Sequence, residues 1–198
     1  MWPKNLSGNY LRETEPALAA ILERTSMTND VATPTRASKV SLRDITIDDV
    51  RAVCMLDVGP GQNELVAPNA VSIAQAHFSP EAWFRAIYAD STPVGFAMLE
   101  DFSQVLDREP ELYQGERYVA LWRFMIDHRY QGLGFGAQAI HLLIAQARSR
   151  PKVKNMLLSF VPKENNPEAF YQRFGFIRTG EEDDGELIMR LTLAQNKI

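Results

Sequence analysis

The amino-acid sequence predicts one mixed α/β domain preceded by a short extension. Three observations predict it. The chain has 198 residues, more than a usual domain of about 150 but too few for two full ones. It is 45% hydrophobic and 23% charged, which is typical of a globular protein. Short β-type apolar runs alternate with helical patterns in the order β-α-α-β-β-β-α-β-α-β-β, which favours a central sheet flanked by helices.

The first 38 residues form the predicted extension. A short amphipathic helix is expected over 15–25, and the polar stretch 26–39 is typical of a linker. Met27 is an alternative start of translation, which would make the first 26 residues an optional or partner-binding segment. We therefore expect two parts, an extension over 1–38 and a folded domain over 39–198.

The folded domain is expected to open with a strand and two helices. The apolar pattern predicts an edge strand over 40–47, and Asp48 and Asp49 are suited to begin the first helix. Asn69 is placed to cap the second helix, because its short amide side chain accepts hydrogen bonds from free N–H groups.

The remaining elements follow from periodicity and turn residues. A hairpin is expected over 83–99 around a turn at 89–93, and a bulky apolar run over 118–126 predicts the next strand. An amphipathic stripe predicts a helix over 137–148, stopped by Pro151. The last elements are then a buried strand over 156–161, a helix over 167–173, and strands over 176–179 and 186–193 around an acidic turn at 181–185.

Composition excludes several classes of function. The formal net charge of −4 and the isoelectric point near 5.4 argue against nucleic acid as a partner. Cys54 is the single cysteine, and the three histidines are scattered, so neither a disulfide nor a metal site is expected. The sequence shows no secretory signal and no run of 18 apolar residues, which predicts a cytoplasmic protein with no membrane partner.

Three glycines at alternate positions lie between the strand over 118–126 and the following helix. Gly132, Gly134 and Gly136 expose backbone N–H groups at a helix N-terminus, which is a suitable cradle for phosphate. A turn that uses glycine for its geometry alone is the alternative. The P-loop motif is absent. The loop satisfies the weak dinucleotide pattern, but it begins too far from its strand and lacks the later ribose-binding acid.

The segment Gln131-x-x-Gly134-x-Gly136 resembles the (Q/R)xxGx(G/A) signature of GCN5-related N-acetyltransferases. That resemblance covers about Val40 to Leu193. It implies acetyl-coenzyme A as co-substrate, and a mostly antiparallel sheet with helices on both faces whose strands splay at the coenzyme A site. It assigns the pyrophosphate and pantetheine contacts to Gln131, Gly132, Leu133, Gly134, Phe135, Gly136 and Ala137 in the loop and to Phe124, Met125 and Ile126 in the preceding strand.

A second segment, from Asn165 to Phe176, is similar to the N…A…FYxxxGF region of the same family. The resemblance implies that Tyr171 donates a proton to the departing thiolate and that Asn165 or Asn166 contacts the cofactor. From helical spacing alone, a packed aromatic residue is the favoured interpretation of Tyr171. Asn166 could equally be the cap of the helix that follows it.

Acetyl transfer needs a neutral amine, whereas a lysine-like amine has a pKa near 10.4. Deprotonation at pH 7 therefore costs roughly 4.6 kcal/mol, which a nearby carboxylate would help to offset. Glu100 is the first candidate for this base and Asp101 the second, with solvated acids at a strand end as the alternative. A backbone N–H from the strand over 124–126 would stabilise the oxyanion.

Further segments resemble bacterial spermine/spermidine (diamine) acetyltransferases, including those around Asn69, Trp122 and Glu186. This implies a small-molecule amine as partner, with polyamines favoured, and contacts to it from Asp101, Trp122 and Asn69. Trp122 offers either a cation–π face or core packing. An antibiotic or protein amino group as acceptor, or a coenzyme A binding module without turnover, are the alternatives. The resemblance also makes a homodimer plausible.

Overall fold

The computed structural model describes residues 33–104, 117–164 and 166–193, and the described residues from Pro34 onward form one compact unit. The helix expected over 15–25 and most of the expected linker lie outside the described residues.

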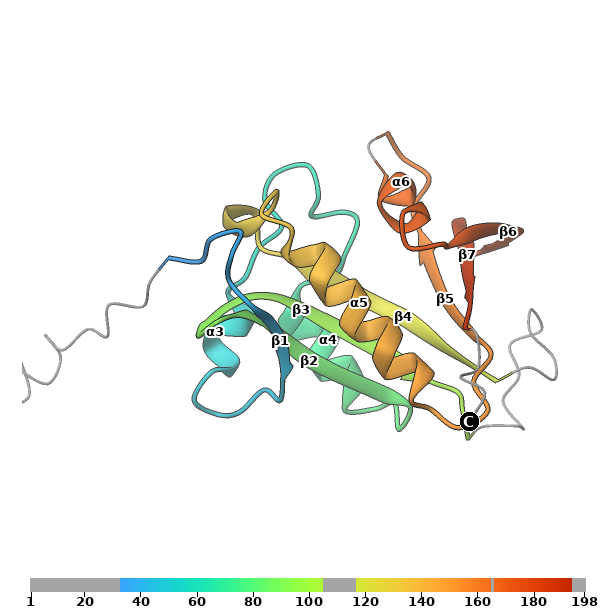
Figure 1. Ribbon diagram of the computed structural model, residues 1–198, viewed down its shortest axis with the longest axis horizontal. Helices are drawn as coiled ribbons and strands as arrows, with labels where there is room; N and C mark the ends of the chain where they lie inside the picture. The colour runs from blue at the N-terminus through green and yellow to red at the C-terminus, as the bar shows by residue number, and fades with distance from the viewer. Residues whose placement is uncertain (1–32, 105–116, 165, 194–198) are drawn as a thin grey trace, which may run out of the picture. The chain divides into compact units, whose positions relative to one another are not determined.

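Seven strands form one sheet in the order β1-β2-β3-β4-β5-β7-β6. The elements are β1 (Val40–Arg43), α3 (Val50–Cys54), α4 (Asn69–Ala76), β2 (Ala82–Ala89), β3 (Thr92–Asp101), β4 (Tyr118–Ile126), the 3-10 helix η2 (His128–Tyr130), α5 (Phe135–Arg148), β5 (Asn155–Phe160), α6 (Glu168–Gln172), β6 (Ile177–Asp183) and β7 (Glu186–Thr192) (Figure 1).

All neighbouring strands are antiparallel except β4 and β5, which run parallel and are joined through α5. The parallel ladder is short and joins Tyr118–Leu121 to Asn155–Leu158. A crossover helix is the usual way to connect parallel neighbours. The prediction of a mixed, mostly antiparallel sheet is confirmed.

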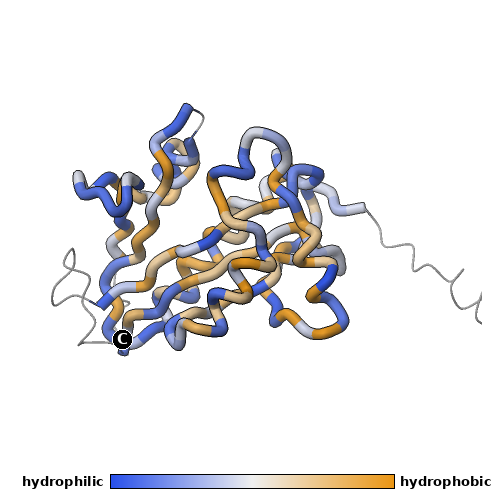
Figure 2. Tube along the Cα trace, turned by 180° about the vertical axis from the view of Figure 1, so that it is seen from behind, coloured by the Kyte–Doolittle hydropathy of each residue, from blue (hydrophilic) through white to orange (hydrophobic). Residues whose placement is uncertain are grey.

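Helices cover both faces of the sheet, as predicted. On one face α5 buries a stripe that includes Ile140 and Leu143, and these pack against apolar residues of the central strands. On the other face α3 and α4 pack over a second cluster that includes Val53, Phe96 and Met98. Figure 2 shows apolar residues along the inner strands and hydrophilic residues around the β6–β7 hairpin.

Strand β1 ends at Arg43, earlier than the expected residue 47. Asp44 forms an ion pair with Arg85 at 3.0 Å, and the side chain of Asp49 accepts a hydrogen bond from the backbone N–H of Thr46. This local turn competes with the strand ladder. The side chain of Ile47, expected to be part of the strand, is consequently 87% exposed.

Both expected hairpin turns are shorter in the structure. Asp90 and Ser91 alone separate β2 from β3. The acidic turn expected over 181–185 shrinks to Asp184 and Gly185, because β6 continues to Asp183. Asp184 and Gly185 both have positive φ, which a two-residue type I′ turn requires. Charged residues therefore form part of this ladder, although their composition is typical of a loop.

The capping role expected for Asn69 is wrong. Asn69 is the first residue of α4, follows Pro68, and has a buried side chain. Its amide nitrogen donates to the backbone carbonyl of Val53 at 2.9 Å, which ties α4 to α3. The buried carbonyl of Val53 gains a partner, and this tertiary contact outweighs the local cap. None of the described helices is long and apolar enough to cross a membrane.

Candidate active site

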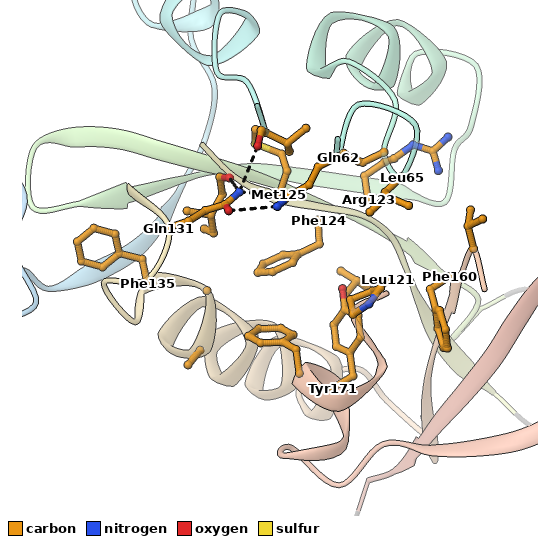
Figure 3. Close-up of a pocket in the computed structure, with 18 of the residues that line it drawn as sticks. Gln62, Leu65, Leu121, Arg123, Phe124, Met125, Gln131, Phe135, Phe160 and Tyr171 are labelled. Carbon is orange, nitrogen blue, oxygen red and sulfur yellow. Dashed lines mark hydrogen bonds between the residues drawn. The ribbon is translucent and has the colours of Figure 1, made fainter. Parts of the chain in front are cut away.

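A cleft opens where β4 and β5 separate. Their pairing ends at Leu121 and Leu158, and a β-bulge follows at once in β4, where the register against β3 shifts around Trp122. Bulges bend the strand that contains them. Beyond this point β5 diverges from β4 (Figure 1). A cavity of about 920 Å³ lies along the separation, and Figure 3 shows side chains that line it.

The second half of β4 presents an open backbone edge to this cavity. Residues 122–126 remain beside β3, and none of the described residues pairs with them on the β5 side. The carbonyls of Trp122 and Ile126 accept from the side chains of Arg123 and Gln131. The other N–H and C=O groups of this edge can bind an extended ligand as an added strand would. Phe124, Met125 and Ile126 all line the cavity, as the sequence predicts for them.

The glycine loop forms one end of the cavity. Gly132 and Gly134 have φ values of +75° and +89°, and a Cβ built on either would meet nothing within 4 Å. Within the described part of the chain, the N–H groups of residues 132–137 donate to no protein acceptor. Helix α5 begins at Phe135, two residues earlier than expected, so its N-terminus adds partial positive charge. The loop can therefore bind an anion.

The side chain of Gln131 holds this loop against neighbouring segments. Its amide nitrogen donates to the backbone carbonyl of Ile126 at 2.9 Å and to the side chain of Gln62 at 3.1 Å (Figure 3). Gln62 belongs to a loop over 62–67 that also lines the cavity. Gln131 therefore joins the glycine loop to the end of β4 and to the loop over 62–67.

The buried carboxylate of Asp127 stabilises the segment that leads into the glycine loop. Asp127 is 1% exposed and accepts hydrogen bonds from the backbone N–H groups of Asp57 and Arg129 and from the Arg129 guanidinium. Burial alone would raise its pKa, but the hydrogen bonds from Arg129 and Asp57 outweigh this and hold the pKa of Asp127 below its ordinary value.

We expect Asp127→Ala to lower the free energy of unfolding by about 2–4 kcal/mol, because two backbone donors lose their acceptor and Arg129 loses its partner. Denaturant unfolding at pH 7 measures this, with the exposed Asp48→Ala expected within about 0.5 kcal/mol of the wild type. Since the folded-state pKa is lowered, the contribution is complete above the unfolded-state pKa near 3.8 and is lost as the pH falls through the folded value. Equal stability of the two variants would contradict the assignment.

Tyr171 lies in α6 with its ring buried between Phe170 and Phe176, and its side chain lines the cavity. Figure 3 shows the phenol directed toward Leu121, at the point where β4 and β5 part. Burial raises the pKa of Tyr171 well above its ordinary value. No hydrogen bond to another described residue engages its hydroxyl. The group is therefore a neutral, protonated phenol that faces the cleft.

The two asparagines before α6 have different outcomes. Asn165 lies outside the described residues. Asn166 does not line the cavity; its side-chain oxygen accepts from the backbone N–H of Glu168 at 3.0 Å, and its nitrogen donates to the carbonyl of Lys163. Pro167, not Asn166, is the N-cap residue of α6, so the capping role expected for Asn166 is wrong by one position. The Asn166 side chain instead closes a turn just before the helix and uses both ends of its amide.

Glu100 and Asp101 stand outside the cavity lining. Asp101 forms an ion pair with Arg150 at 2.9 Å. Glu100 is half-buried on β3; burial and the nearby Glu81 raise its pKa, and Arg123 opposes this. Neither carboxylate lies among the residues of the cleft.

Most of the other predicted contacts gather at the cleft. Trp122 lines the cavity and also packs against the apolar cluster under α4. Leu133 packs against the α5 side of the core, and Asn69 is buried elsewhere. The remaining loop and strand residues assigned to the coenzyme line the cavity: Phe124, Met125, Ile126, Gln131, Gly132, Gly134, Phe135, Gly136 and Ala137.

Ser159 and Glu186 are among the polar residues of the cleft to which the sequence analysis assigns no role. Ser159 interrupts the apolar run of β5 and faces away from the core, and Glu186 begins β7; both line the cavity. Ser159 could have been noticed in the sequence, because it is the polar exception within an apolar run. The contact between the two side chains depends on the β5–β7 register, which local sequence does not encode. Within the described ranges, no cluster of three or more His, Cys, Asp or Glu side chains is arranged to hold a metal ion.

Comparisons with known proteins agree with this geometry. Residues 55–176 match the model of the acetyltransferase (GNAT) family. The chain is 33% identical over 157 residues to a spermine/spermidine N(1)-acetyltransferase of Bacillus subtilis, a match that covers 76% of this chain and 96% of the relative.

Solved structures share the fold. An acetyltransferase from Thermus thermophilus superposes with a TM-score of 0.59 at 17% identity, covering 78% of this chain and 97% of that one. A PaiA N-acetyltransferase from Thermoplasma acidophilum, solved with coenzyme A, has a TM-score of 0.54 at 14% identity over 78% of this chain and 99% of that one. The glycine loop, the splayed strands and these matches together show that the chain belongs to the GNAT family and is an N-acetyltransferase.

Proposed function

We propose that the protein transfers the acetyl group of acetyl-coenzyme A to a primary amine of a small molecule, with polyamines as the favoured acceptors. One observation supports this above all others. A single cleft joins an anion-binding loop, an open strand edge and a buried neutral phenol. These are the groups needed to hold an acyl thioester and to protonate its leaving group.

The residues of the cleft fit coenzyme A. The free N–H groups of residues 132–137, with the N-terminus of α5, suit a pyrophosphate. The open edge of β4 over 122–126 suits the amide groups of a pantetheine arm. When bound there, the coenzyme supplies the activated acetyl group.

Tyr171 would hold a proton at its hydroxyl oxygen and give it to the departing sulfur. Its raised pKa keeps the phenol protonated at neutral pH, so the proton is present when negative charge develops. A backbone N–H on the edge of β4 near Phe124 would meet the developing oxyanion. Both groups are fixed by packing before the substrate arrives, which avoids reorganisation during the reaction.

The polyamine preference rests on the curated relatives and on acidic residues near the cleft. The matched Bacillus subtilis relative is named as a spermine/spermidine acetyltransferase. Glu64 and Glu186 line the cavity. The guanidinium of Arg123 lies 5.1 Å from the centroid of the Trp122 ring. One face of Trp122 therefore already has a cation, which disfavours a cation–π role for that face toward the acceptor.

We expect release of free thiol when the protein is mixed with acetyl-coenzyme A and spermidine or spermine, at a rate well above that without amine. The same assay with monoamines, aminoglycosides and peptides with free amino groups ranks the acceptors by kcat/KM. Activity on other amines with none on polyamines would remove the polyamine preference. Coenzyme A binding by calorimetry without turnover on any amine would favour a binding module instead.

A further inference from the structure

Ser159 and Glu186 meet at the mouth of the cleft. Ser159 on β5 pairs with Ile188 on β7, so Glu186, two residues earlier, lies diagonally across on the same face of the sheet. The hydroxyl of Ser159 donates to Oε2 of Glu186 at 2.5 Å, and both side chains line the cavity. The carboxylate is thereby oriented by a neighbouring strand.

This face of the sheet is opposite to the one that carries Tyr171. Leu158 and Met189 belong to the apolar cluster beneath α5, together with Tyr171. Because side chains alternate along a strand, Ser159 and Glu186 point to the other face. The phenol and the carboxylate therefore border the cleft from its two sides.

Arg123 reaches the same place from β4. The bulge at Trp122 puts two consecutive residues on the α4 side, where a terminal nitrogen of Arg123 contacts Gln75 of α4 at 3.4 Å. Burial lowers the pKa of Arg123, and the charges of Glu186 and Glu100 oppose this. Arg123 lines the cavity and interacts electrostatically with both carboxylates.

Glu186 differs from the other carboxylate of the cavity. Glu64 is bonded to the ammonium of Lys163. For Glu186, no Lys, Arg or His nitrogen of the described residues lies within 4.0 Å. Its hydrogen-bond partner is the neutral hydroxyl of Ser159, and Arg123 acts on it only as a nearby charge, so no ion pair has to be broken before a cationic ligand binds.

We propose that Glu186, oriented by Ser159, binds the ammonium group of the acceptor amine and accepts its proton on the side of the cleft opposite Tyr171. This rests on the proposed acetyl transfer. The ammonium gives one proton to Glu186, which passes it to solvent. The nitrogen lone pair forms the C–N bond as the C–S bond breaks. The sulfur takes the proton of Tyr171, and the second surplus proton of the nitrogen restores the phenol through solvent.

This assignment replaces Glu100, the base favoured from sequence, with a residue that borders the cleft. Glu100 is on β3 beside Ala120, does not line the cavity and interacts with Arg123. The groups that face Glu186 are Ser159 from β5, Arg123 from β4 and its cross-strand partner Asp183 from β6.

The test compares Glu186→Gln with Glu100→Gln and with Glu182→Gln, an exposed acid of the same hairpin outside the cavity. We expect Glu186→Gln to lower kcat/KM for the amine by about 10²–10⁴ and to change the acidic limb of its pH profile, with the coenzyme A affinity unchanged. Glu182→Gln should match the wild type. Ser159→Ala, which removes the orienting hydroxyl, should cause a smaller loss.

The inference is overturned if Glu186→Gln keeps kcat/KM within about threefold of the wild type, or if it loses coenzyme A affinity to the same extent as activity. A large loss confined to Glu100→Gln would also overturn it. Failure of the proposed function is a different result, because the wild-type protein would then release no thiol with any amine.

Discussion

Replacing Tyr171 with phenylalanine is expected to lower kcat by at least about 100-fold, with coenzyme A affinity unchanged. The ring keeps its contacts with Phe170 and Phe176, and the only atom removed is the hydroxyl oxygen that holds the proton. Proton transfer by a positioned side chain typically contributes 10²–10⁴-fold. Steady-state and single-turnover measurements of thiol release, with calorimetry of coenzyme A binding, test this.

The matched control is Tyr88→Phe. Tyr88 is also a buried tyrosine, but its hydroxyl donates to Asp49 on the α3 side of the sheet, away from the cleft. Its removal should lower the free energy of unfolding by about 1 kcal/mol and leave kcat unchanged. If Tyr171→Phe keeps the wild-type rate while the chemical step limits turnover, Tyr171 is not the proton donor.

The second large effect is expected at the glycine loop. Gly134→Val should raise the Kd of coenzyme A by at least about 100-fold, because the side chain would enter the open space over the free N–H groups of residues 132–137. The loss of two charge-assisted hydrogen bonds, about 3 kcal/mol in total, corresponds to that factor. Isothermal titration calorimetry measures the affinity directly.

Backbone strain must be separated from lost binding in this experiment. Gly180, on β6 and outside the cavity, has a φ of +88° against +89° for Gly134, and a Cβ there also meets nothing within 4 Å. Gly180→Val should therefore lose a similar stability, about 1–3 kcal/mol, while it keeps its coenzyme A affinity. Equal affinities in the two variants would remove the pyrophosphate role of the loop.

Elements with a strong local pattern could be predicted from sequence. The strand over 118–126 agrees with β4 at both ends, since a bulky apolar run has few other conformations. The helix over 137–148 agrees with α5 at its end, where Pro151 follows. The glycine loop was recognisable because three glycines at alternate positions are a local signal.

What could not be predicted depends on contacts distant in sequence. Asn69 is of a residue type that often caps helices, but its side-chain amide donates instead to the backbone carbonyl of Val53, 16 residues away. Glu100 follows a strand in a plausible place, yet the register of β3 against β4 places it outside the cleft. Ser159 and Glu186 are 27 residues apart and meet through strand pairing alone. Tertiary contacts, which no single segment specifies, decided these three outcomes.

The bulge in β4 separates two kinds of adaptation in this enzyme. In the proposed mode of binding, the coenzyme would contact main-chain groups, which no substitution of side chains removes, whereas the bulge turns the side chains of Trp122 and Arg123 together toward the α4 face. Exchanging these two neighbours would alter the chemical character of the proposed acceptor side and leave the main-chain edge in place. Under this proposal, substitutions at two adjacent positions would change the preference for the acceptor while the contacts to the acyl donor stay the same.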